Sequence, residues 1–360
     1  MTDPRTAVAK ARRIVVKIGS STLARDAGAY DRLASAVRAL ADAGKQVVLV
    51  SSGAIALGTK KLGYRSRPKE MARLQAAAAA GQSLLMRAYE EAFAREGLAV
   101  AQVLLTHADL ADRVRGNNAR AALSALLDAR AVPVLNENDS VAVEEIKFGD
   151  NDELSAMVTP LVDADVLVLL SDVDGLLDKE GTRVSVIRDV ATEALPLVRA
   201  KKSDVGTGGM ASKIEAARRA TLAGAHVVIA DARKTGVLTR IFAGEDEGTV
   251  FVAATRRLSA KKHWIAFTLR PRGDVWLDAG AAAAVRSKGK SVLAVGVTGV
   301  RGDFRGGDSV RVLAPDGEEL GRGLARCSSV EAVVLAGRKE KKGDPEDQAI
   351  LVHRDDLVVW

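Results

Sequence analysis

At Ile14-Val15-Val16-Lys17-Ile18-Gly19-Ser20-Ser21 the sequence predicts a β-strand that ends in a turn of small residues. The β-branched residues suit a pleated, buried strand. A lysine in such a run is costly unless its ammonium group leaves at the end of the strand or meets an anion. Lys17 is therefore a candidate functional residue. The alternative is a lysine whose aliphatic chain carries the charge to the surface.

Six further apolar runs and a series of helical patterns follow this strand in alternation. The apolar runs cover residues 46–50, 100–105, 132–135, 166–170, 227–230 and 249–252. Helical spacing of apolar residues covers 31–43, 71–95, 108–130, 151–162, 210–222 and 236–242, with a small β excursion at 141–148. Unbroken apolar strands are typical of a parallel sheet that helices cover on both faces. We therefore predict an α/β fold, a three-layer αβα sandwich with a mainly parallel central sheet.

The sequence changes character near residue 255. Residues 255–263 are basic and predict a linker, and from residue 264 short alternating segments are separated by glycines. The segments cover residues 274–277, 292–297, 309–312 and 330–335, and a charged loop is expected at 337–348. This pattern predicts a small all-β, barrel-like domain. We expect one domain at residues 1–258 and the β domain at 264–360.

The composition is that of an ordinary globular protein. Of 360 residues, 48% are hydrophobic and 28% are charged. Cys327 is the only cysteine, which excludes an intrachain disulfide and a cysteine-rich zinc site. The sequence has neither an apolar signal core nor 18 consecutive apolar residues. We therefore expect a cytoplasmic protein without a membrane segment.

Polar residues gather at the carboxyl ends of the predicted strands. They are Gly19-Ser20, Ser51-Ser52-Gly53, the segment 136–139, and Ser171-Asp172. Parallel α/β sheets bind their ligands beyond this edge. Ser52, Gly53 and Ala54 offer a hydroxyl group and backbone amides that suit a carboxylate or phosphoryl oxygen. An ordinary helix N-cap would use the same residue types.

Acidic residues crowd the segment that follows the fourth predicted strand. Asp139, Asp150 and Asp152 lie there together with Asn138 and Asn151. Aspartate and asparagine favour turns, which is the simplest explanation. The carboxylates could also orient lysines, bind an ammonium group or hold Mg²⁺. The sequence does not assign a metal ligand among them.

A second lysine follows a glycine-rich loop, Gly206-Thr207-Gly208-Gly209-Met210-Ala211-Ser212-Lys213. Glycine lets backbone N–H groups approach a ligand closely. The helix that begins here adds unpaired amides and the positive end of a dipole. Both features favour an anion within reach of Lys213. The alternative is a glycine-rich surface turn that caps a helix.

Three familiar catalytic motifs are missing from the sequence. It has no P-loop, no Gly-x-Gly-x-x-Gly after the first strand and no nucleophile elbow. What remains is two lysines, several carboxylates and the amides of a glycine loop. This inventory favours phosphoryl transfer, because that reaction depends mainly on positioned positive charge.

Five motifs in one order resemble those of the glutamate 5-kinase family, the amino-acid kinases that open proline synthesis. They cover residues 16–21, 51–55, 136–139, 149–156 and 206–213. Residues 272–351 resemble the PUA domain that many bacterial members carry. One departure is Ser171, where a threonine is also familiar; the hydroxyl group is kept.

The resemblance implies that residues 1–258 transfer phosphate from ATP, with Mg²⁺, to the side-chain carboxylate of L-glutamate. It implies catalytic roles for Lys17, Lys213 and Asp152. Glutamate would be bound by Ser52, Gly53, Ala54, Asp139, Asp150 and Asn151. The nucleotide would be bound by Lys17, Ser171, Asp172, Thr207, Gly208, Gly209, Met210, Ala211, Ser212 and Lys213. The resemblance also implies feedback inhibition by proline and a homo-oligomer, either a dimer or a tetramer.

Two other functions fit parts of the sequence. A kinase of the same fold could act on N-acetylglutamate, aspartate or UMP, although the segment 136–139 and the PUA-like tail favour glutamate. The tail could instead bind RNA, because the chain has a net charge of +7. Residues 264–360, however, carry 15 Lys and Arg against 14 Asp and Glu, which argues against a nucleic-acid partner.

Overall fold

The computed structural model describes residues 3–25, 28–141, 151–200, 209–255, 257–337 and 350–360. The chain divides into two compact units, Met1–Arg257 and Leu258–Trp360. None of the described helices is both long enough and apolar enough to cross a membrane.

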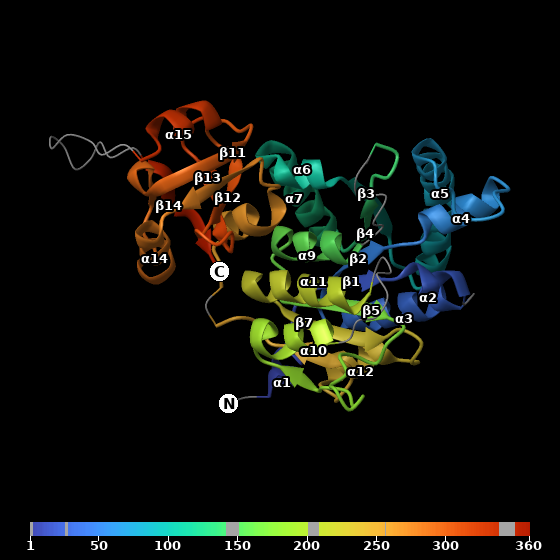
Figure 1. The fold of residues 1–360 in the computed structure, drawn as a ribbon. Helices are drawn as coiled ribbons and strands as arrows, with labels where there is room; N and C mark the ends of the chain where they lie inside the picture. Colours follow the sequence, from blue (N-terminus) through green and yellow to red (C-terminus); the bar gives the residue numbers. More distant parts are fainter. Residues whose placement is uncertain (1–2, 26–27, 142–150, 201–208, 256, 338–349) are drawn as a thin grey trace. The chain divides into compact units, whose positions relative to one another are not determined.

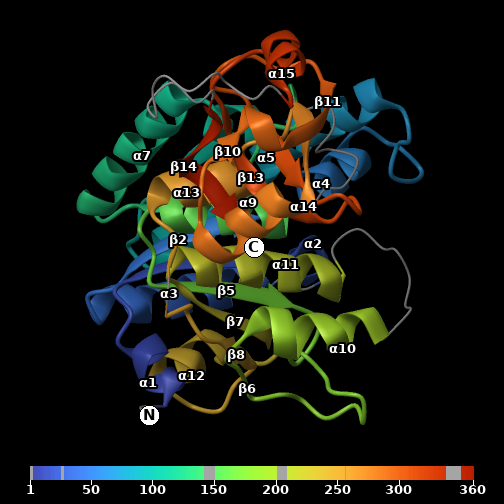
Figure 2. The same cartoon turned by 60° about the vertical axis from the view of Figure 1, so that its left-hand side comes forward.

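The first unit is built on one eight-stranded sheet of the order β3-β4-β2-β1-β5-β7-β8-β6 (Figure 1). The strands are β1 (Arg13–Ile18), β2 (Gln46–Ser51), β3 (Val100–Leu105), β4 (Val132–Glu137), β5 (Val166–Ser171), β6 (Val186–Ile187), β7 (His226–Asp231) and β8 (Thr249–Phe251). Every neighbouring pair is parallel except β7 and β8. The predicted mainly parallel sheet is therefore confirmed. Figure 2 shows β5, β7, β8 and β6 following one another across it.

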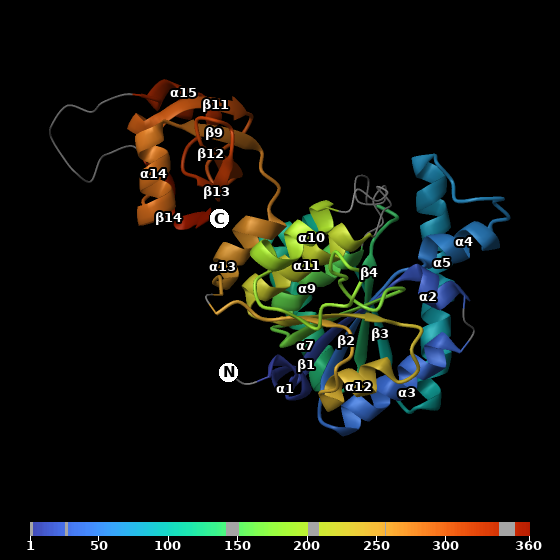
Figure 3. The ribbon, with the colours of Figure 1, turned by 60° about the horizontal axis from the view of Figure 1, so that its bottom comes forward.

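Helices cover both faces of this sheet (Figure 3). One layer contains α3 (Ala29–Asp42), α5 (Met71–Arg95) and α12 (Val237–Ala243), and the other contains α7 (Arg113–Asp128), α9 (Asn151–Leu161) and α11 (Met210–Ala223). Alternate residues of each strand enter opposite cores. On β1, Val16 packs with the first layer and Val15 with the second. The three-layer prediction is confirmed.

Some predicted elements differ from the structure. The single helix expected at 108–130 is two helices, α6 (His107–Ala111) and α7, because the Asp112 side chain accepts hydrogen bonds from the amides of Val114 and Arg115 and begins a new helix there. The turn expected after β1 is a short helix, α2 (Ser20–Arg25). The β excursion expected at 141–148 lies outside the described residues except for residue 141. Further helices are α1 (Pro4–Ala9), α4 (Ala54–Lys61) and α10 (Leu195–Ala200), together with a π-helical turn at Val190–Ala194.

Helices α4 and α5 cross with their backbones in direct contact. A Cβ atom on Gly58 of α4 would lie 1.7 Å from the carbonyl oxygen of Ala77. A Cβ atom on Gly81 of α5 would lie 1.8 Å from the carbonyl oxygen of Ala54. Only glycine permits so close an approach. The alanine-rich run at 76–80 therefore lines a helix crossing that two glycines make possible.

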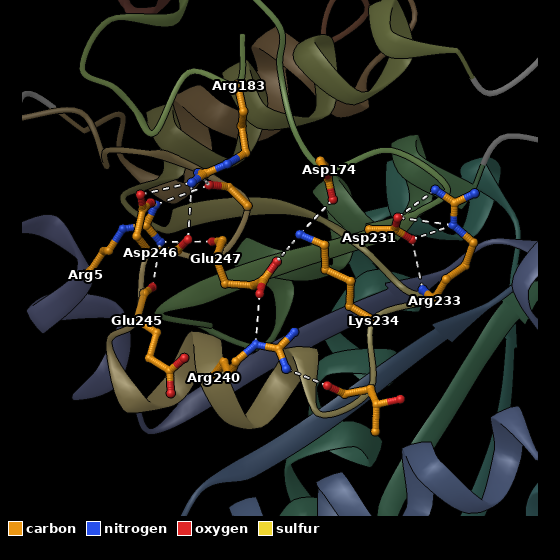
Figure 4. A network of polar contacts seen from close by, with 12 residues as sticks. Arg5, Asp174, Arg183, Asp231, Arg233, Lys234, Arg240, Glu245, Asp246 and Glu247 are labelled. Carbon is orange, nitrogen blue, oxygen red and sulfur yellow. Dashed lines mark hydrogen bonds and ion pairs between the residues drawn. The ribbon is translucent and has the colours of Figure 1, made fainter.

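A buried arginine, Arg5, holds the N-terminal helix α1 to the segment 245–248, which lies late in the sequence of the first unit (Figure 4). The Arg5 guanidinium donates hydrogen bonds to the carbonyl oxygens of Glu245 and Glu247, both at 2.9 Å, and of Gly248 at 3.1 Å. It also pairs with Asp246, and nearby cations hold the pKa of that carboxyl at about 2. Burial lowers the pKa of Arg5. The segment 245–248 is thus held by residues from the opposite end of the domain's sequence.

The second unit has a six-stranded sheet of the order β10-β14-β13-β12-β9-β11. The strands are β9 (Gly273–Leu277), β10 (Val292–Leu293), β11 (Val297–Gly302), β12 (Ser309–Leu313), β13 (Glu319–Ala325) and β14 (Ile350–Val359). Their buried side chains form a separate core that includes Val275, Val312 and Leu357. The barrel-like β architecture is confirmed.

This unit also contains helices that the sequence pattern missed. They are α13 (Ala260–His263), within the expected linker, a π-helical turn at Trp264–Thr268, a 3₁₀ turn at Ala294–Gly296, α14 (Ala279–Lys288) and α15 (Ser329–Leu335). The strand expected at 330–335 is wrong, because α15 occupies it. Its valines favour a strand, but Ser328 and Glu331 form a capping box that starts a helix.

We predict that Gly58→Ala or Gly81→Ala lowers the free energy of unfolding of the first unit by about 3 kcal/mol, the upper end of the cost of overpacking. The added methyl group would have to push a backbone carbonyl aside. Urea denaturation followed by circular dichroism measures the loss.

Gly116→Ala in α7 is the matched control. Its Cβ atom would lie 3.6 Å from the nearest atom, the carbonyl oxygen of Leu110, which is ordinary contact. Since alanine favours a helix over glycine, this variant should be as stable as the wild type or more stable by up to about 1 kcal/mol. If Gly58→Ala behaved like Gly116→Ala, the close crossing of α4 and α5 would not constrain the fold.

Candidate functional site

A buried carboxylate between two lysines lies beyond the carboxyl ends of β1 and β5. Asp152 is fully buried, and its two oxygens face different lysines. Lys17 Nζ lies 2.5 Å from Asp152 Oδ1, and Lys213 Nζ lies 3.4 Å from Asp152 Oδ2. Ser212 Oγ donates a hydrogen bond of 2.9 Å to the same Oδ2 atom. Segments far apart in the sequence, around residues 17 and 212–213, thus meet at the Asp152 carboxylate.

The fold brings each of these side chains to the centre for a simple reason. Lys17 lies next to the last residue of β1, and strand alternation turns it toward the layer of α9 and α11, as it does Val15. Asp152 lies in the first turn of α9, where a negative charge is favourable. Lys213 lies in the first turn of α11. The two helices run side by side (Figure 1); α9 packs on β1, which carries Lys17, and α11 packs on β7.

A network of ion pairs and hydrogen bonds between charged side chains holds α9 and α11 next to each other. Arg219 of α11 donates a hydrogen bond of 2.6 Å to Glu153, the neighbour of Asp152 on α9. Arg219 and Arg218 also pair with Glu215 on their own helix. Burial would raise the pKa of Glu215, but hydrogen bonds and charge from these arginines outweigh it and lower that pKa.

The net charge of the trio formed by Lys17, Asp152 and Lys213 favours the binding of an anion. Burial alone would raise the pKa of Asp152, but the charges of Lys17 and Lys213 and hydrogen bonds from Lys17 and Ser212 outweigh it, so the pKa is lowered. Asp152 is therefore ionised, and the three side chains together carry one excess positive charge. A buried excess charge is unfavourable until an anion joins it.

A cavity of about 310 Å³ opens beside this centre. It is lined by Ser20, Ser52, Gly53, Ala54, Ile55, Ala56, Thr59, Arg67, Asn136, Glu137, Asp139 and Asn151. Its size suits a small ligand. Asn151 belongs both to this lining and, as the neighbour of Asp152, to the edge of the charged centre. The cavity therefore adjoins the charged centre at its Asn151 end, although neither lysine is among its described lining residues.

Asn151 links the segments that form its end of the cavity by hydrogen bonds. Its side-chain amide donates to the carbonyl oxygen of Ser51 at 2.6 Å, to Ser52 Oγ at 3.0 Å and to Asn136 Oδ1 at 2.9 Å. Asn136 in turn donates to Gln82 of α5 at 2.9 Å. At the adjoining end of α4, Gly53 is the N-cap, with φ +118°, and no side chain caps the helix. The amides at the start of α4 consequently face the cavity without a side-chain acceptor.

The carboxyl group of Asp139, in the lining of the cavity, has a raised pKa. Burial raises its pKa to about 6, although the charge of Arg67 works in the opposite direction. Such a group changes its charge just below neutral pH. A cation bound beside Asp139 would favour the ionised form.

The ends of β5 and β7 form a second polar edge (Figure 4). Arg233 pairs with Asp231 and donates a hydrogen bond of 2.9 Å to the carbonyl oxygen of Asp172. Lys234 lies between Asp174, at 2.8 Å, and Glu247, at 3.0 Å. Residues 172–174 are therefore held from β7 by two cations. Ser171 Oγ lies 3.2 Å from Asp172 Oδ1 at the tip of β5.

The start of α11 completes the arrangement within the described residues. Gly209 is its N-cap, and no side chain accepts a hydrogen bond from the first amides. The N–H groups of Met210 and Ala211 are thus available to an anion next to Lys213. Thr207 and Gly208 of the predicted nucleotide loop, and Asp150 of the predicted substrate set, lie outside the described residues.

The structure places the predicted residues in three groups. Lys17, Asp152 and Lys213 form the charged centre, with Ser212 beside them. Ser52, Gly53, Ala54, Asp139 and Asn151 line the cavity. Ser171 and Asp172 lie at the end of β5, and Gly209, Met210 and Ala211 lie at the start of α11.

Sequence reasoning assigned no role to seven lining residues, of which five are polar or charged: Ser20, Thr59, Arg67, Asn136 and Glu137. Ser20, Asn136 and Glu137 belong to the polar clusters at strand ends, which was a usable signal. Thr59 and Arg67 have no such signal, because they reach the cavity from a helix flank and a loop.

The described residues contain no group of three or more His, Cys, Asp or Glu side chains that could hold a metal ion. Asp152 is engaged by both lysines. Magnesium in phosphate-transferring sites commonly binds to substrate phosphates, water and only one or two protein carboxylates. The donor set described fits a magnesium ion that is held mainly by a bound nucleotide.

Comparisons with known proteins agree with this arrangement. The model of the amino acid kinase family matches residues 12–231, and that of the PUA domain matches residues 273–344. A glutamate 5-kinase of Trichlorobacter lovleyi is 45% identical over 97% of this chain and 96% of its own length. One of Cupriavidus metallidurans is 46% identical over 99% of this chain and 100% of its own. The resemblance seen in the five motifs is confirmed.

Solved structures share the fold at much lower identity. A Giardia carbamate kinase has a TM-score of 0.52 and 16% identity, and it covers 68% of this chain and 100% of its own. An N-acetylglutamate synthase from Neisseria gonorrhoeae has a TM-score of 0.52 and 17% identity over 80% of this chain and 70% of its own. Together with the family match over most of the first unit, these findings show that the chain belongs to the amino acid kinase family and carries a PUA domain behind its kinase unit.

Proposed function

We propose that this protein transfers the γ-phosphoryl group of ATP to the side-chain carboxylate of L-glutamate and forms ADP and L-glutamyl 5-phosphate. The observation that carries this proposal is the buried Lys17–Asp152–Lys213 trio at the edge of an amino-acid-sized cavity. Its excess positive charge suits the phosphoryl group in transit. Relatives named glutamate 5-kinase, similar over nearly their whole length, support the choice of substrate.

The reaction needs little covalent help from the protein. A side-chain carboxylate oxygen of glutamate attacks the γ-phosphorus, and the bond to the β,γ-bridging oxygen breaks, so ADP leaves with that electron pair. No proton has to move, because the attacking carboxylate is already ionised. Lys17 and Lys213 stabilise the negative charge of the transferring group from opposite sides, and Asp152 keeps both ammonium groups in place.

The surrounding residues would bind and orient the two substrates. Asn151, Ser52 and the first amides of α4 hold the reacting carboxylate, and Asp139 attracts the ammonium group. The start of α11 and the tip of β5 hold the nucleotide. Magnesium, when bound on its phosphates, would neutralise part of their charge. Proline inhibition, the place of the reaction in proline synthesis and the dimer or tetramer implied by the resemblance stay predictions.

A substrate panel tests this function. Release of ADP is measured with L-glutamate, N-acetylglutamate, aspartate and UMP as acceptors. We expect glutamate to give the highest kcat/KM. Faster turnover of N-acetylglutamate or UMP would overturn the assignment.

We predict that Lys17→Ala and Lys213→Ala each lower kcat by roughly 10²–10³-fold, the usual loss when a preorganised charge-stabilising donor is removed. Lys10→Ala, which removes an exposed lysine, is the control and should leave kcat unchanged. Steady-state kinetics with saturating ATP and glutamate measure the effect, and thermal melting checks that each variant folds. A lysine whose removal changes kcat by less than a factor of three has no part in the chemistry.

We predict that kcat/KM for glutamate falls as the pH drops below about 6, because the pKa of Asp139 is raised to about 6 by burial. Below that pH the carboxyl group becomes neutral and no longer attracts the substrate ammonium group. The fall should approach tenfold per pH unit. The pKa of Asp152 is lowered, so the trio keeps its charge over this range.

Asp139→Asn provides the comparison for the pH profile. It should raise the KM for glutamate mainly, because it removes ground-state binding. Its kcat/KM should be low and nearly independent of pH between 5 and 7. A profile that still bends near pH 6 in this variant would assign the titration to another group.

A further inference from the structure

We propose that Arg67 binds the α-carboxylate of the substrate and so makes the enzyme select an amino acid over a simple acid. This inference rests on the proposed function. It concerns the charged side chains of the cavity lining, where none of the motifs assigns a cationic residue.

The position of Arg67 is the first observation. It lies in the loop of residues 62–70, between α4 and α5, and its side chain lines the cavity. Pro68 follows it directly, which disfavours a helical backbone at Arg67. The loop is carried by the tight crossing of α4 and α5 at Gly58 and Gly81. The pair of helices fixes both ends of this loop, and Arg67, although exposed, is the loop residue that lines the cavity.

The charges along the cavity are the second observation. Among the lining residues that the structure describes, Arg67 has the only cationic side chain, and Glu137 and Asp139 have the anionic ones. Arg67 lies close enough to Asp139 to lower the pKa of that carboxyl group against the effect of burial. A positive and a negative group thus lie within electrostatic reach of each other in the lining of the cavity.

The substrate presents the matching pair. The α-carbon of glutamate carries a carboxylate and an ammonium group, and its reacting carboxylate lies three carbons away. If the reacting carboxylate is next to Asn151, the α-carbon lies deeper in the cavity, whose charged lining residues are Asp139, Glu137 and Arg67. The acids suit the ammonium group but repel the α-carboxylate, which leaves Arg67 as its partner. A guanidinium binds a carboxylate with two parallel hydrogen bonds.

The amides at the start of α4 are the competing partners for the α-carboxylate. They lie next to Ser52 and Asn151, at the end of the cavity that adjoins the charged centre, so they are better placed for the reacting carboxylate. If Arg67 binds the α-carboxylate, removing Arg67 weakens the binding of glutamate but not that of an analogue without this carboxylate. If the amides of α4 bind it, removing Arg67 leaves the binding of glutamate unchanged.

The test crosses an enzyme variant with a substrate analogue. Kinetics with L-glutamate are measured for the wild type and for the Arg67→Ala, Arg67→Lys and Arg65→Ala variants. Inhibition constants are measured in parallel for 4-aminobutyrate, which keeps the ammonium group and the terminal carboxylate but lacks the α-carboxylate. Arg65 lies in the same loop, is exposed and does not line the cavity, so it is the matched control.

We expect Arg67→Ala to raise the KM for glutamate by about 10- to 100-fold while kcat changes less than threefold. The inhibition constant of 4-aminobutyrate should not change, and Arg67→Lys should recover part of the loss because it keeps the charge. Arg65→Ala should behave like the wild type.

Three results would overturn the inference: an unchanged KM in Arg67→Ala, an equal loss for glutamate and 4-aminobutyrate, or no recovery in Arg67→Lys. If 4-aminobutyrate does not inhibit the wild type measurably, the KM of Arg67→Ala and its recovery in Arg67→Lys decide alone. A wild type that does not phosphorylate glutamate is a failure of the proposed function and not of the role of Arg67.

Discussion

The buried pairing of Asp152 with Lys17 and Lys213 is the interaction on which the rest of the kinase unit depends. Two ammonium groups in the interior of a protein are stable only when a charge of opposite sign lies between them. One carboxylate meets that need and still leaves an excess positive charge. The same arrangement that stabilises the two buried lysines therefore makes the centre receptive to a phosphate. Stability and binding are set by one side chain.

The position of this centre explains which elements of the kinase unit supply the residues of the site. The strand β1 supplies one lysine, and the starts of α9 and α11 supply the carboxylate and the second lysine. All three starting points lie at the carboxyl edge of the sheet, near the place where the strand order changes direction. The cavity with Asp139 and Arg67 extends to one side of this edge, toward β4 and α4. The polar edge of β5 and β7 extends to the other.

Much of this was predictable because it depends on local sequence. Continuous apolar runs predicted every strand of the first unit except the two-residue β6, and β3 with its full bounds. Polar residues at the strand ends indicated the edge of the sheet where the charged centre lies. Lys17 was noticeable because a charge interrupts an apolar strand. Contacts between distant segments were not predictable. Gly58 and Gly81 look like weak points of two helices until their crossing is known, and Arg67 belongs to a loop without periodicity. In the second unit, the valines of α15 favoured a strand, and the capping box that overrode them spans only four residues.

The clamp formed by Arg5 has a consequence for the order in which the chain is made. Its acceptors at Ser185, Glu245, Glu247 and Gly248 lie 180 to 243 residues further along the chain. During synthesis on the ribosome, α1 emerges before the rest of the kinase unit, but the acceptors of Arg5 are present only after almost the whole unit has followed. The contacts of Arg5 are thus among the last of the kinase unit to form.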